Sequence, residues 1–164
     1  MVTVFILIAF GFCNRIGNDD LIINNDIKTA EKDIRDRGYV VVKTEGEIDK
    51  YTLDKNKIYG EISTTPYQQI WGLQNIDALE YFGNEITVYK FIVKNHPLEK
   101  QYSNSKNGIE LYYMLSDGVI IGGYSYPNSN IAGSFSSLEG KSIEEVTGLT
   151  FNEWEKAWRE KYSN

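Results

Sequence analysis

Apolar residues recur along the chain at two different periods, and the changes of period predict where helices give way to strands. Near the N-terminus, four apolar residues are separated by three or four positions with charged residues between them: Ile23, Ile27, Ala30 and Ile34. This spacing predicts an amphipathic helix. Gly38 supplies the left-handed residue that commonly ends a helix. The run YVVV (39–42), one aromatic and three β-branched residues, follows it, so we expect a strand there.

The middle of the chain alternates between strand-like and helix-like patterns. The segment EGEIDKYTL (45–53) has acidic residues at alternate positions and predicts a second strand whose solvated face carries Glu45, Glu47 and Asp49. Thr65 before Pro66 is typical of a helix start, which predicts a short helix over 66–75. The run EITVYKFIVK (85–94) predicts a strand that ends before Pro97.

The segment GIELYYMLSDGVIIGGYSYP contains the strongest hairpin signal in the sequence. Asp117-Gly118 lies between two apolar runs, which favours a two-residue type I′ turn. If Ser116 pairs with Val119, the same register places Tyr113 opposite Gly122 and Tyr112 opposite Gly123. One face of the hairpin then belongs to the core, and its residues are Ile109, Leu111, Tyr113, Leu115, Ile120, Gly122, Tyr124 and Tyr126.

Two capping-box patterns near the C-terminus predict two further helices, one starting at Ser142 with Glu145 and one at Thr150 with Glu153. The last helix has an aromatic stripe that can dock on a sheet. Together the elements predict a single α+β domain over residues 27–162, with a mainly antiparallel sheet, a β-hairpin at about 109–126, and helices that cover the sheet.

The first thirteen residues form an apolar segment that ends in the only cysteine of the chain. The run from Val2 to Phe12 has the length of a secretory apolar region, roughly 7–15 residues, and is too short to span a bilayer, which takes about 20. We expect residues 1–13 to be an export leader of lipoprotein type, with lipid attached at Cys13, and residues 14–26 to be a polar spacer. The leader lacks a preceding Lys or Arg, and Phe12 replaces the usual small residue, so a buried N-terminal strand stays open as an alternative.

Charge and composition limit the partners. The 164 residues carry 17 Lys and Arg against 23 Asp and Glu, a net charge of −6, and the basic residues are scattered. Because nucleic-acid binding requires concentrated positive charge, we expect no nucleic-acid partner. We expect the protein outside the cytoplasm, either secreted or anchored to the outer face of the cell membrane through its N-terminus.

Candidate catalytic chemistry is sparse. His96 is the only histidine, which excludes any site that needs two histidine ligands, and we expect it to be a hydrogen-bonded or solvated residue at a strand exit. There it would contribute at most about 1 kcal/mol. The LEGKS stretch (138–142) lacks the first glycine of a phosphate-binding loop. We therefore assign no catalytic residues, and expect neither a cofactor nor a metal site.

Tyrosine is abundant, with twelve residues, and several lie around the predicted hairpin. The predicted register sends most of these rings into the core. Tyr102 and Tyr112 are the two that we expect at the surface, where tyrosine commonly provides binding contacts. They are the candidate binding residues for a peptide, a glycan or a protein of the cell envelope.

Four stretches carry a resemblance to a known family: IWGLQNIDALEYFG, ITVYKFIVKNHPLE, DGVIIGGYSYP and SLEGKSIEEVTGLTFNEWEKAWREKY. In this order they resemble domain of unknown function 4830, a family of small exported proteins from Gram-positive spore-forming bacteria, over about residues 27–162. The resemblance implies export, often with a lipoprotein-type leader, and it implies no catalytic residues.

These observations favour a non-catalytic binding module for a peptide, an envelope component or a partner protein. The alternative is a hydrolase that uses carboxylates, with or without His96. The two classes differ in what the fold should show: a cleft with His96 or two converging carboxylates for the enzyme, and an aromatic surface for the binding module.

Overall fold

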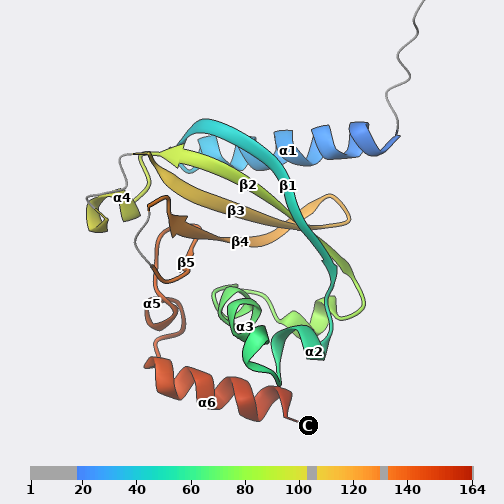
Figure 1. The fold of residues 1–164 in the computed structure, drawn as a ribbon, viewed down its shortest axis with the longest axis vertical. Coiled ribbons are helices and arrows are strands. Elements are labelled where there is room, and N and C mark those ends of the chain that lie inside the picture. The colour runs from blue at the N-terminus through green and yellow to red at the C-terminus, as the bar shows by residue number, and fades with distance from the viewer. Residues whose placement is uncertain (1–17, 103–106, 130–132, 164) are drawn as a thin grey trace, which may run out of the picture.

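One antiparallel sheet organises the fold, and helices lie on both of its faces (Figure 1). The computed structural model describes residues 18–102, 107–129 and 133–163. Within them five strands form the sheet in the order β1-β2-β3-β4-β5, so strands that are adjacent in the chain are adjacent in space. The elements are α1 (Asn18–Asp36), β1 (Val40–Thr52), α2 (Lys55–Ile58), η1 (Ile62–Thr64), α3 (Thr65–Gly72), η2 (Ala78–Tyr81), β2 (Glu85–Lys94), α4 (Leu98–Gln101), β3 (Ile109–Ser116), β4 (Val119–Pro127), β5 (Ser136–Ser137), α5 (Ile143–Thr147) and α6 (Phe151–Tyr162).

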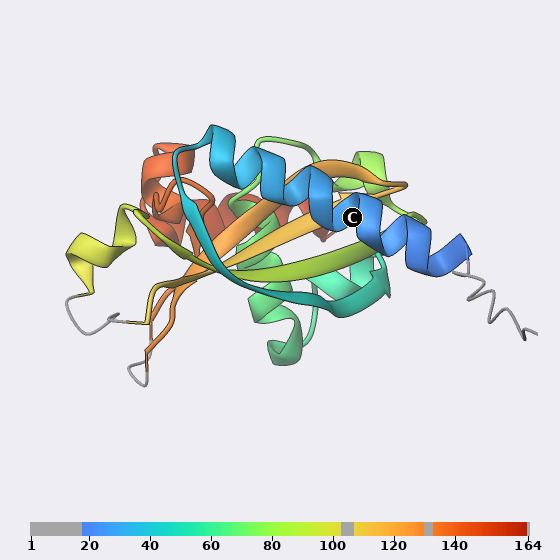
Figure 2. The ribbon, with the colours of Figure 1, turned by 90° about the horizontal axis from the view of Figure 1, so that it is seen from above.

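Helix α1 runs along one face of the sheet, as the view from above shows (Figure 2). Its buried residues Ala30 and Ile34 pack on side chains of β2 and β3, because residues at alternate positions of a strand point to the same face. We name this cluster the α1-side core. Its buried members are Ala30, Ile34, Tyr39, Tyr89, Phe91, Val93, Leu98, Ile109, Leu111, Tyr113, Leu115 and Leu138.

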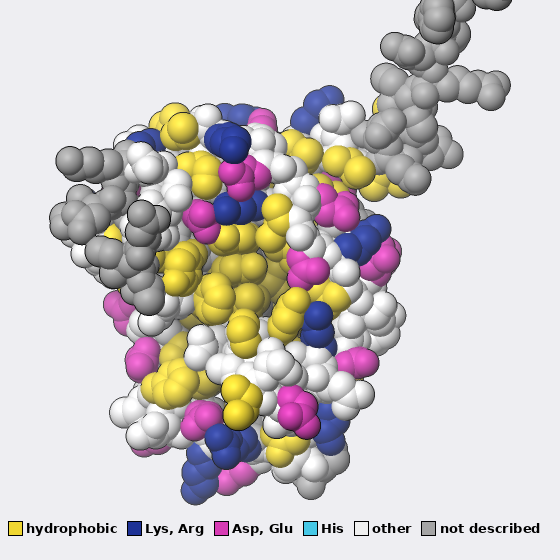
Figure 3. Space-filling view, in the orientation of Figure 1, with side chains coloured by type: hydrophobic (Ala, Val, Ile, Leu, Met, Phe, Trp, Pro, Cys, Tyr) yellow, Lys and Arg dark blue, Asp and Glu magenta, His cyan; other side chains and the backbone are white. Residues whose placement is uncertain are grey.

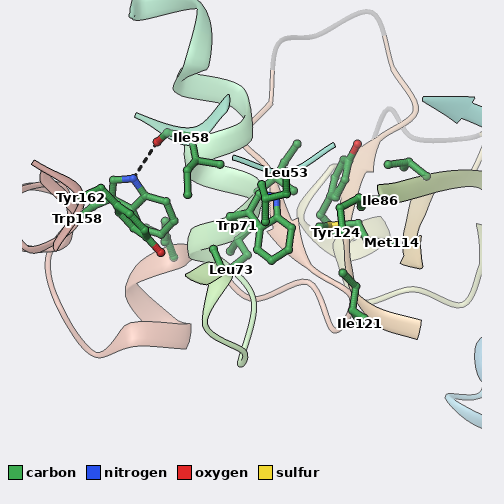
Figure 4. Packing of buried hydrophobic residues seen from close by; sticks show 14 of the residues in the cluster. Leu53, Ile58, Trp71, Leu73, Ile86, Met114, Ile121, Tyr124, Trp158 and Tyr162 are labelled. Atoms are coloured by element: carbon green, nitrogen blue, oxygen red, sulfur yellow. Dashed lines mark hydrogen bonds between the residues drawn. The ribbon is translucent and has the colours of Figure 1, made fainter. Parts of the chain in front are cut away.

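On the opposite face the sheet packs against α2, α3 and α5, and α6 packs on the far side of α2 and α3 (Figure 1 and Figure 4). The indole Nε1 of Trp158 donates a hydrogen bond to the carbonyl of Ile58 at 3.0 Å, which joins α6 to α2. We name this cluster the helix-side core. Its buried members are Leu53, Ile58, Ile70, Trp71, Leu73, Ala78, Ile86, Val88, Met114, Ile121, Tyr124, Ile143, Trp154, Trp158 and Tyr162.

The predicted fold class is confirmed: the chain is a single α+β domain with an antiparallel sheet, the expected hairpin and helices on the sheet. Both predicted capping boxes form, at Ser142 and at Thr150. Helix α1 begins at Asn18 and so includes much of the segment expected to be a polar spacer, 14–26. Residues 1–13, the expected leader, lie outside the described residues.

The predicted strands at 39–42 and 45–53 are in fact one strand, β1, with three irregularities in its pairing. Gly46 has a φ of 86° beside one of them, a conformation that glycine adopts without steric cost. Because of these bulges, the acidic residues of β1 do not all point to one face at alternate positions, contrary to the sequence prediction. Asp49 pairs with Val88 on the helix-side face, whereas Glu47 pairs with Tyr89 on the α1 side, so the acidic residues do not share one solvated face.

The hairpin turn forms as predicted, with positive φ at both Asp117 and Gly118, and the two residue pairs nearest the turn have the expected register. Met114 then pairs with Gly122, which leaves Ile121 as an extra residue of β4. This β-bulge shifts the following residues of β4 to the opposite face.

The bulge corrects our assignment of the hairpin tyrosines. Tyr113 lies opposite Gly123, not Gly122, and Tyr112 lies opposite Tyr124, not Gly123. Tyr124 and Tyr126 therefore share the face of Tyr112 instead of the core face of Tyr113. The sequence signal at the turn specifies only the nearest pairs, and beyond the bulge Gln74, in the loop after α3, is hydrogen-bonded to Gly123 of β4.

None of the helices in the described part of the chain is both long and apolar enough to cross a membrane.

Candidate functional site

The helix-side face of the sheet carries a row of aromatic and charged residues beyond the part packed in the core. Lys90 of β2, Tyr112 of β3 and Tyr124 of β4 are direct cross-strand neighbours. Glu110 and Tyr126 form the next pair along β3 and β4. Lys90, Glu110, Tyr112 and Tyr126 are all partly exposed, so this row meets solvent at the edge of the core.

The tyrosines of this row are ordered by ring contacts. The rings of Tyr112 and Tyr124 are stacked, with centroids 4.5 Å apart and an angle of 8° between their planes. Phe135, just before β5, meets Tyr124 edge-on at 5.4 Å and lies 5.5 Å from Tyr126. Such pairs contribute about 0.5–1.5 kcal/mol beyond the area they bury. The rings therefore hold one another in fixed orientations.

A second pair of rings extends the surface towards α3. Tyr51 of β1 and Tyr67 of α3 are 5.2 Å apart at 74°, and both pack against the cluster that contains Tyr124. The hydroxyl of Tyr67 donates to Asp49 at 2.9 Å. We define the aromatic face as Tyr51, Tyr67, Tyr112, Tyr124, Tyr126 and Phe135. In Figure 3, hydrophobic side chains gather in a hollow between the strands and the lower helices, with charged side chains around it.

One lysine bridges two carboxylates beside the stacked rings. The Nζ of Lys90 is 2.8 Å from Glu110 and 3.2 Å from Glu45. Its side chain and that of Glu110 are each 18% exposed. Burial opposes the charge of Lys90, but the two carboxylates outweigh it and raise the pKa of Lys90. The lysine therefore stays charged and its two carboxylates are already partnered.

The hydroxyl of Tyr112 is fixed by the same group of charges. It donates to the second oxygen of Glu110 at 2.5 Å, while the Lys90 ammonium lies 5.6 Å from the centre of the Tyr112 ring. Burial, and after it the hydrogen bond to Glu110, raises the pKa of Tyr112. The phenol remains a neutral donor, and one face of its ring is covered by Tyr124.

The two predicted binding tyrosines do not form one site. Tyr112 belongs to the aromatic face, as expected of a surface tyrosine. Tyr102, at the end of α4, packs against the α1-side core instead. Cys13, the predicted lipid attachment site, lies outside the described residues.

Most of the aromatic face differs from what the sequence predicts. Tyr124 and Tyr126 were assigned to the other side of the hairpin, and Tyr51, Tyr67 and Phe135 come from segments far from it in the chain. The double glycine Gly122-Gly123 is the one local signal that suggests an irregular strand, since glycine inside a strand often marks a bulge.

His96 is placed where it cannot act as an acid or base on this surface. Its side chain is buried, with 2% exposed. The amide of Leu98 donates to Nδ1 at 3.2 Å, so the proton is on Nε2, which donates to the carbonyl of Leu138 at 3.0 Å. Burial lowers the pKa of His96, although the bond to Leu138 partly opposes this shift. Both ring nitrogens are used within the fold.

The described residues contain no group of three or more histidine, cysteine or acidic side chains placed to hold a metal ion. Comparisons of the chain with protein-family models, with curated proteins and with solved structures give no match. The functional assignment therefore depends on the geometry of the aromatic face.

Proposed function

We propose that the chain is a non-catalytic binding module that takes a polypeptide partner on the aromatic face. The observation that carries this proposal is the ordered, partly exposed set of rings around the stacked pair Tyr112 and Tyr124. Tyrosine-rich centres surrounded by charged groups are typical of protein-binding surfaces, where aromatic residues contribute most of the affinity.

A polypeptide suits this surface better than a glycan. Sugars stack on an open aromatic ring face, but Tyr124 covers one face of Tyr112 and the Lys90 ammonium lies over the ring as well. The ring offers mainly its edge and its hydroxyl. Edges, hydroxyls and bridged charges are suited to the mixed polar and apolar side chains of a peptide or a protein.

The hydrolase alternative has less support from the described residues. Glu45 and Glu110 both contact Lys90, and the nearest hydroxyl, that of Tyr112, donates to Glu110. A carboxylate pair in a hydrolase needs one protonated member and room for substrate between the two. Here a lysine lies between them, and hydrogen bonds from Lys43 and Lys90 lower the pKa of Glu45.

The binding proposal is tested by capture from envelope extracts followed by affinity measurement on the captured polypeptide. We expect Tyr112→Ala and Tyr126→Ala to weaken binding by about tenfold each, as the loss of an aromatic anchor commonly does. Tyr102→Ala, which changes a tyrosine outside the aromatic face, is the matched control and should bind within about twofold of the unaltered chain.

Three results would contradict the proposal. The first is equal capture by all three variants at equal folded fraction. The second is a captured component that resists proteases and is digested by glycosidases. The third is turnover in a hydrolase screen that Glu110→Gln abolishes, which would instead support the enzyme.

We also propose that the protein is exported and held at the outer face of the membrane through lipid on Cys13. The support is the apolar run that precedes Cys13 and the resemblance to domain of unknown function 4830. In a Gram-positive host, Cys13→Ser should move the protein from the membrane fraction to the medium. Cytosolic protein that retains Met1, seen by mass spectrometry, would contradict export.

A further inference from the structure

The ammonium group of Lys57 lies over two tyrosine rings at one end of the aromatic face. Its Nζ is 3.9 Å from the centre of the Tyr67 ring and 4.8 Å from that of Tyr51. The two rings meet nearly at a right angle, so they form the walls of a corner. Asp49 accepts the Tyr67 hydroxyl hydrogen bond beside them. Two ring faces and a carboxylate attract a cation more strongly than one ring does.

The rings of this corner are held independently of the lysine. Trp71, whose side chain is almost fully buried, donates its indole hydrogen bond to the Tyr51 hydroxyl at 3.1 Å. Tyr67 is held by Asp49. Lys57 has only its flexible four-carbon stem on the single turn of α2. The corner is therefore preformed, and its occupant is exchangeable.

A comparison within α2 distinguishes this contact from an ordinary surface contact. The ammonium group of Lys55 lies 5.7 Å from the centre of the Tyr59 ring. Lys57 is closer to each of two rings. If Lys57 leaves the corner, both ring faces become open to an external cation.

We propose that Tyr51, Tyr67 and Asp49 form a cation-binding corner, which Lys57 fills in the free chain and which a lysine or arginine side chain of the partner enters on binding. The partner assignment rests on the proposed function, because the corner packs against the same cluster as the stacked pair Tyr112 and Tyr124. Lys57 thus acts as an internal competitor that selects partners with a basic side chain at this position.

The corner is tested with tetramethylammonium chloride and with N-acetylarginine amide, followed by NMR on the ring signals of Tyr51 and Tyr67 and on the indole N–H signal of Trp71. We expect Lys57→Ala to bind both cations at least about fivefold more tightly than the unaltered chain, because the internal competitor is gone. Lys55→Ala should bind like the unaltered chain. tert-Butanol, a neutral molecule of similar shape to tetramethylammonium, should cause no comparable shift.

A further substitution locates the binding site: adding Tyr67→Leu to Lys57→Ala should abolish the gain. Lys57→Gln, which keeps most of the stem and removes the charge, should also raise the affinity and serves if alanine loosens α2. Equal cation affinity in the unaltered chain and in both Lys57 variants would contradict the proposal that Lys57 occupies a cation-binding corner.

The outcomes also separate this inference from the proposed function, because the probes need no partner. Suppose that cations bind at the corner but Tyr112→Ala and Tyr126→Ala still capture the partner as the unaltered chain does. This result would contradict the proposed function and support the cation-binding corner. If those two variants lose partner capture and Lys57→Ala binds no cation, the proposed function would be supported and the cation-binding corner would be contradicted.

Discussion

His96 has a larger structural role than its place before a proline suggests. Its ring makes hydrogen bonds to Leu98 and Leu138 and lies 4.8 Å from the ring of Tyr39. We therefore expect His96→Ala to lower the free energy of unfolding by about 2–4 kcal/mol, from the lost packing and the unpaired amide of Leu98. The Leu138 carbonyl keeps the hydrogen bond that the Tyr39 hydroxyl donates to it. The expected loss is more than the value of about 1 kcal/mol expected of a strand-exit residue, because His96 is buried. Urea denaturation, with Lys100→Ala as an exposed control, measures the difference.

The burial of His96 also predicts a pH dependence of stability. Its pKa is lowered in the folded chain, despite the opposing influence of Glu99 and Glu139, so below the ordinary value of 6.5 the unfolded chain binds this proton more readily than the folded chain. The neutral His96 ring therefore contributes fully to the free energy of unfolding above about pH 6.5. As the pH falls from there towards the pKa of His96 in the folded chain, the free energy of unfolding decreases by up to about 1.4 kcal/mol per pH unit.

This pH dependence is measured by urea denaturation between pH 7.5 and 5.5, which lies above the ordinary range of the carboxylates. His96→Gln removes the titrating ring and should make the curve flatter in this window. Parallel curves for the two proteins would show that His96 is not buried in its neutral form.

Alanine at either of two adjacent glycines of β4 should destabilise the fold, through different contacts. A Cβ on Gly123 would lie 2.3 Å from the backbone carbonyl oxygen of Tyr112 and 2.8 Å from Leu138, and a paired strand cannot easily move away. We expect Gly123→Ala to cost about 2–4 kcal/mol, at the upper end for overpacking. A Cβ on Gly122 would meet the side-chain oxygen of Gln74, not Tyr113. Gln74 can turn aside only by breaking its hydrogen bonds to Gly123, so we expect Gly122→Ala to cost about 1–3 kcal/mol as well. Thermal unfolding measures both variants, and amide exchange at Gly123 should be faster in Gly122→Ala if Gln74 is displaced.

At the scale of elements, Gln74 takes the place of a strand neighbour for β4. Its side-chain amide accepts from the Gly123 amide at 2.9 Å and donates to the Gly123 carbonyl at 3.1 Å. Strand β5 pairs only with the two residues that follow Gly123. The loop after α3 therefore satisfies the backbone of β4 next to the bulge, where the strand would otherwise present unpaired groups.

We expect Gln74→Leu to lower the free energy of unfolding by about 1–3 kcal/mol, because it leaves both backbone groups of Gly123 without these partners. Gln68→Leu, the same substitution within α3, is the control. Amide hydrogen exchange at Gly123 provides the specific readout, since its protection should fall in the Gln74 variant. Unchanged exchange there would mean that the Gln74 bonds contribute nothing to β4.

The elements that could be predicted are those specified by nearby residues. The Asp117-Gly118 turn and the two capping boxes depend on a few adjacent side chains, and all of them form. The bulge at Ile121 brings Gly123 into hydrogen bonds with Gln74, which is far away in the chain, and the turn signal does not include this contact. The continuity of β1 through Gly46 likewise depends on pairing with β2.

The candidate site was less predictable than the fold for the same reason. Tyr112 could be identified as a surface residue, but its stacking on Tyr124 follows from the bulge. The corner formed by Tyr51 and Tyr67 needs α3 to be placed against β1, and no periodicity specifies that contact. A tyrosine-rich composition indicates that aromatic contacts exist without saying which rings meet.

At the scale of the whole molecule, the two cores are joined by the strands between them. Neighbouring residues of β2 alternate between the clusters, with Val88 in the helix-side core and Tyr89 in the α1-side core. β3 does the same with Met114 and Tyr113. A strand cannot lose its packing on one face and keep its position on the other. We therefore infer that both cores unfold in one cooperative transition.

The three tryptophans allow this inference to be tested, because Trp71, Trp154 and Trp158 all lie in the helix-side core. Ile34→Ala removes buried atoms from the α1-side core, on the other side of the sheet, and should cost about 2–4 kcal/mol. We expect tryptophan fluorescence to report this loss in full, with a urea midpoint that coincides with the one from far-UV circular dichroism. Val42→Ala, at an exposed position of β1, should change stability by less than about 0.5 kcal/mol. A fluorescence transition that stays at its original midpoint in Ile34→Ala, while circular dichroism shifts, would mean that the two faces of the sheet unfold independently.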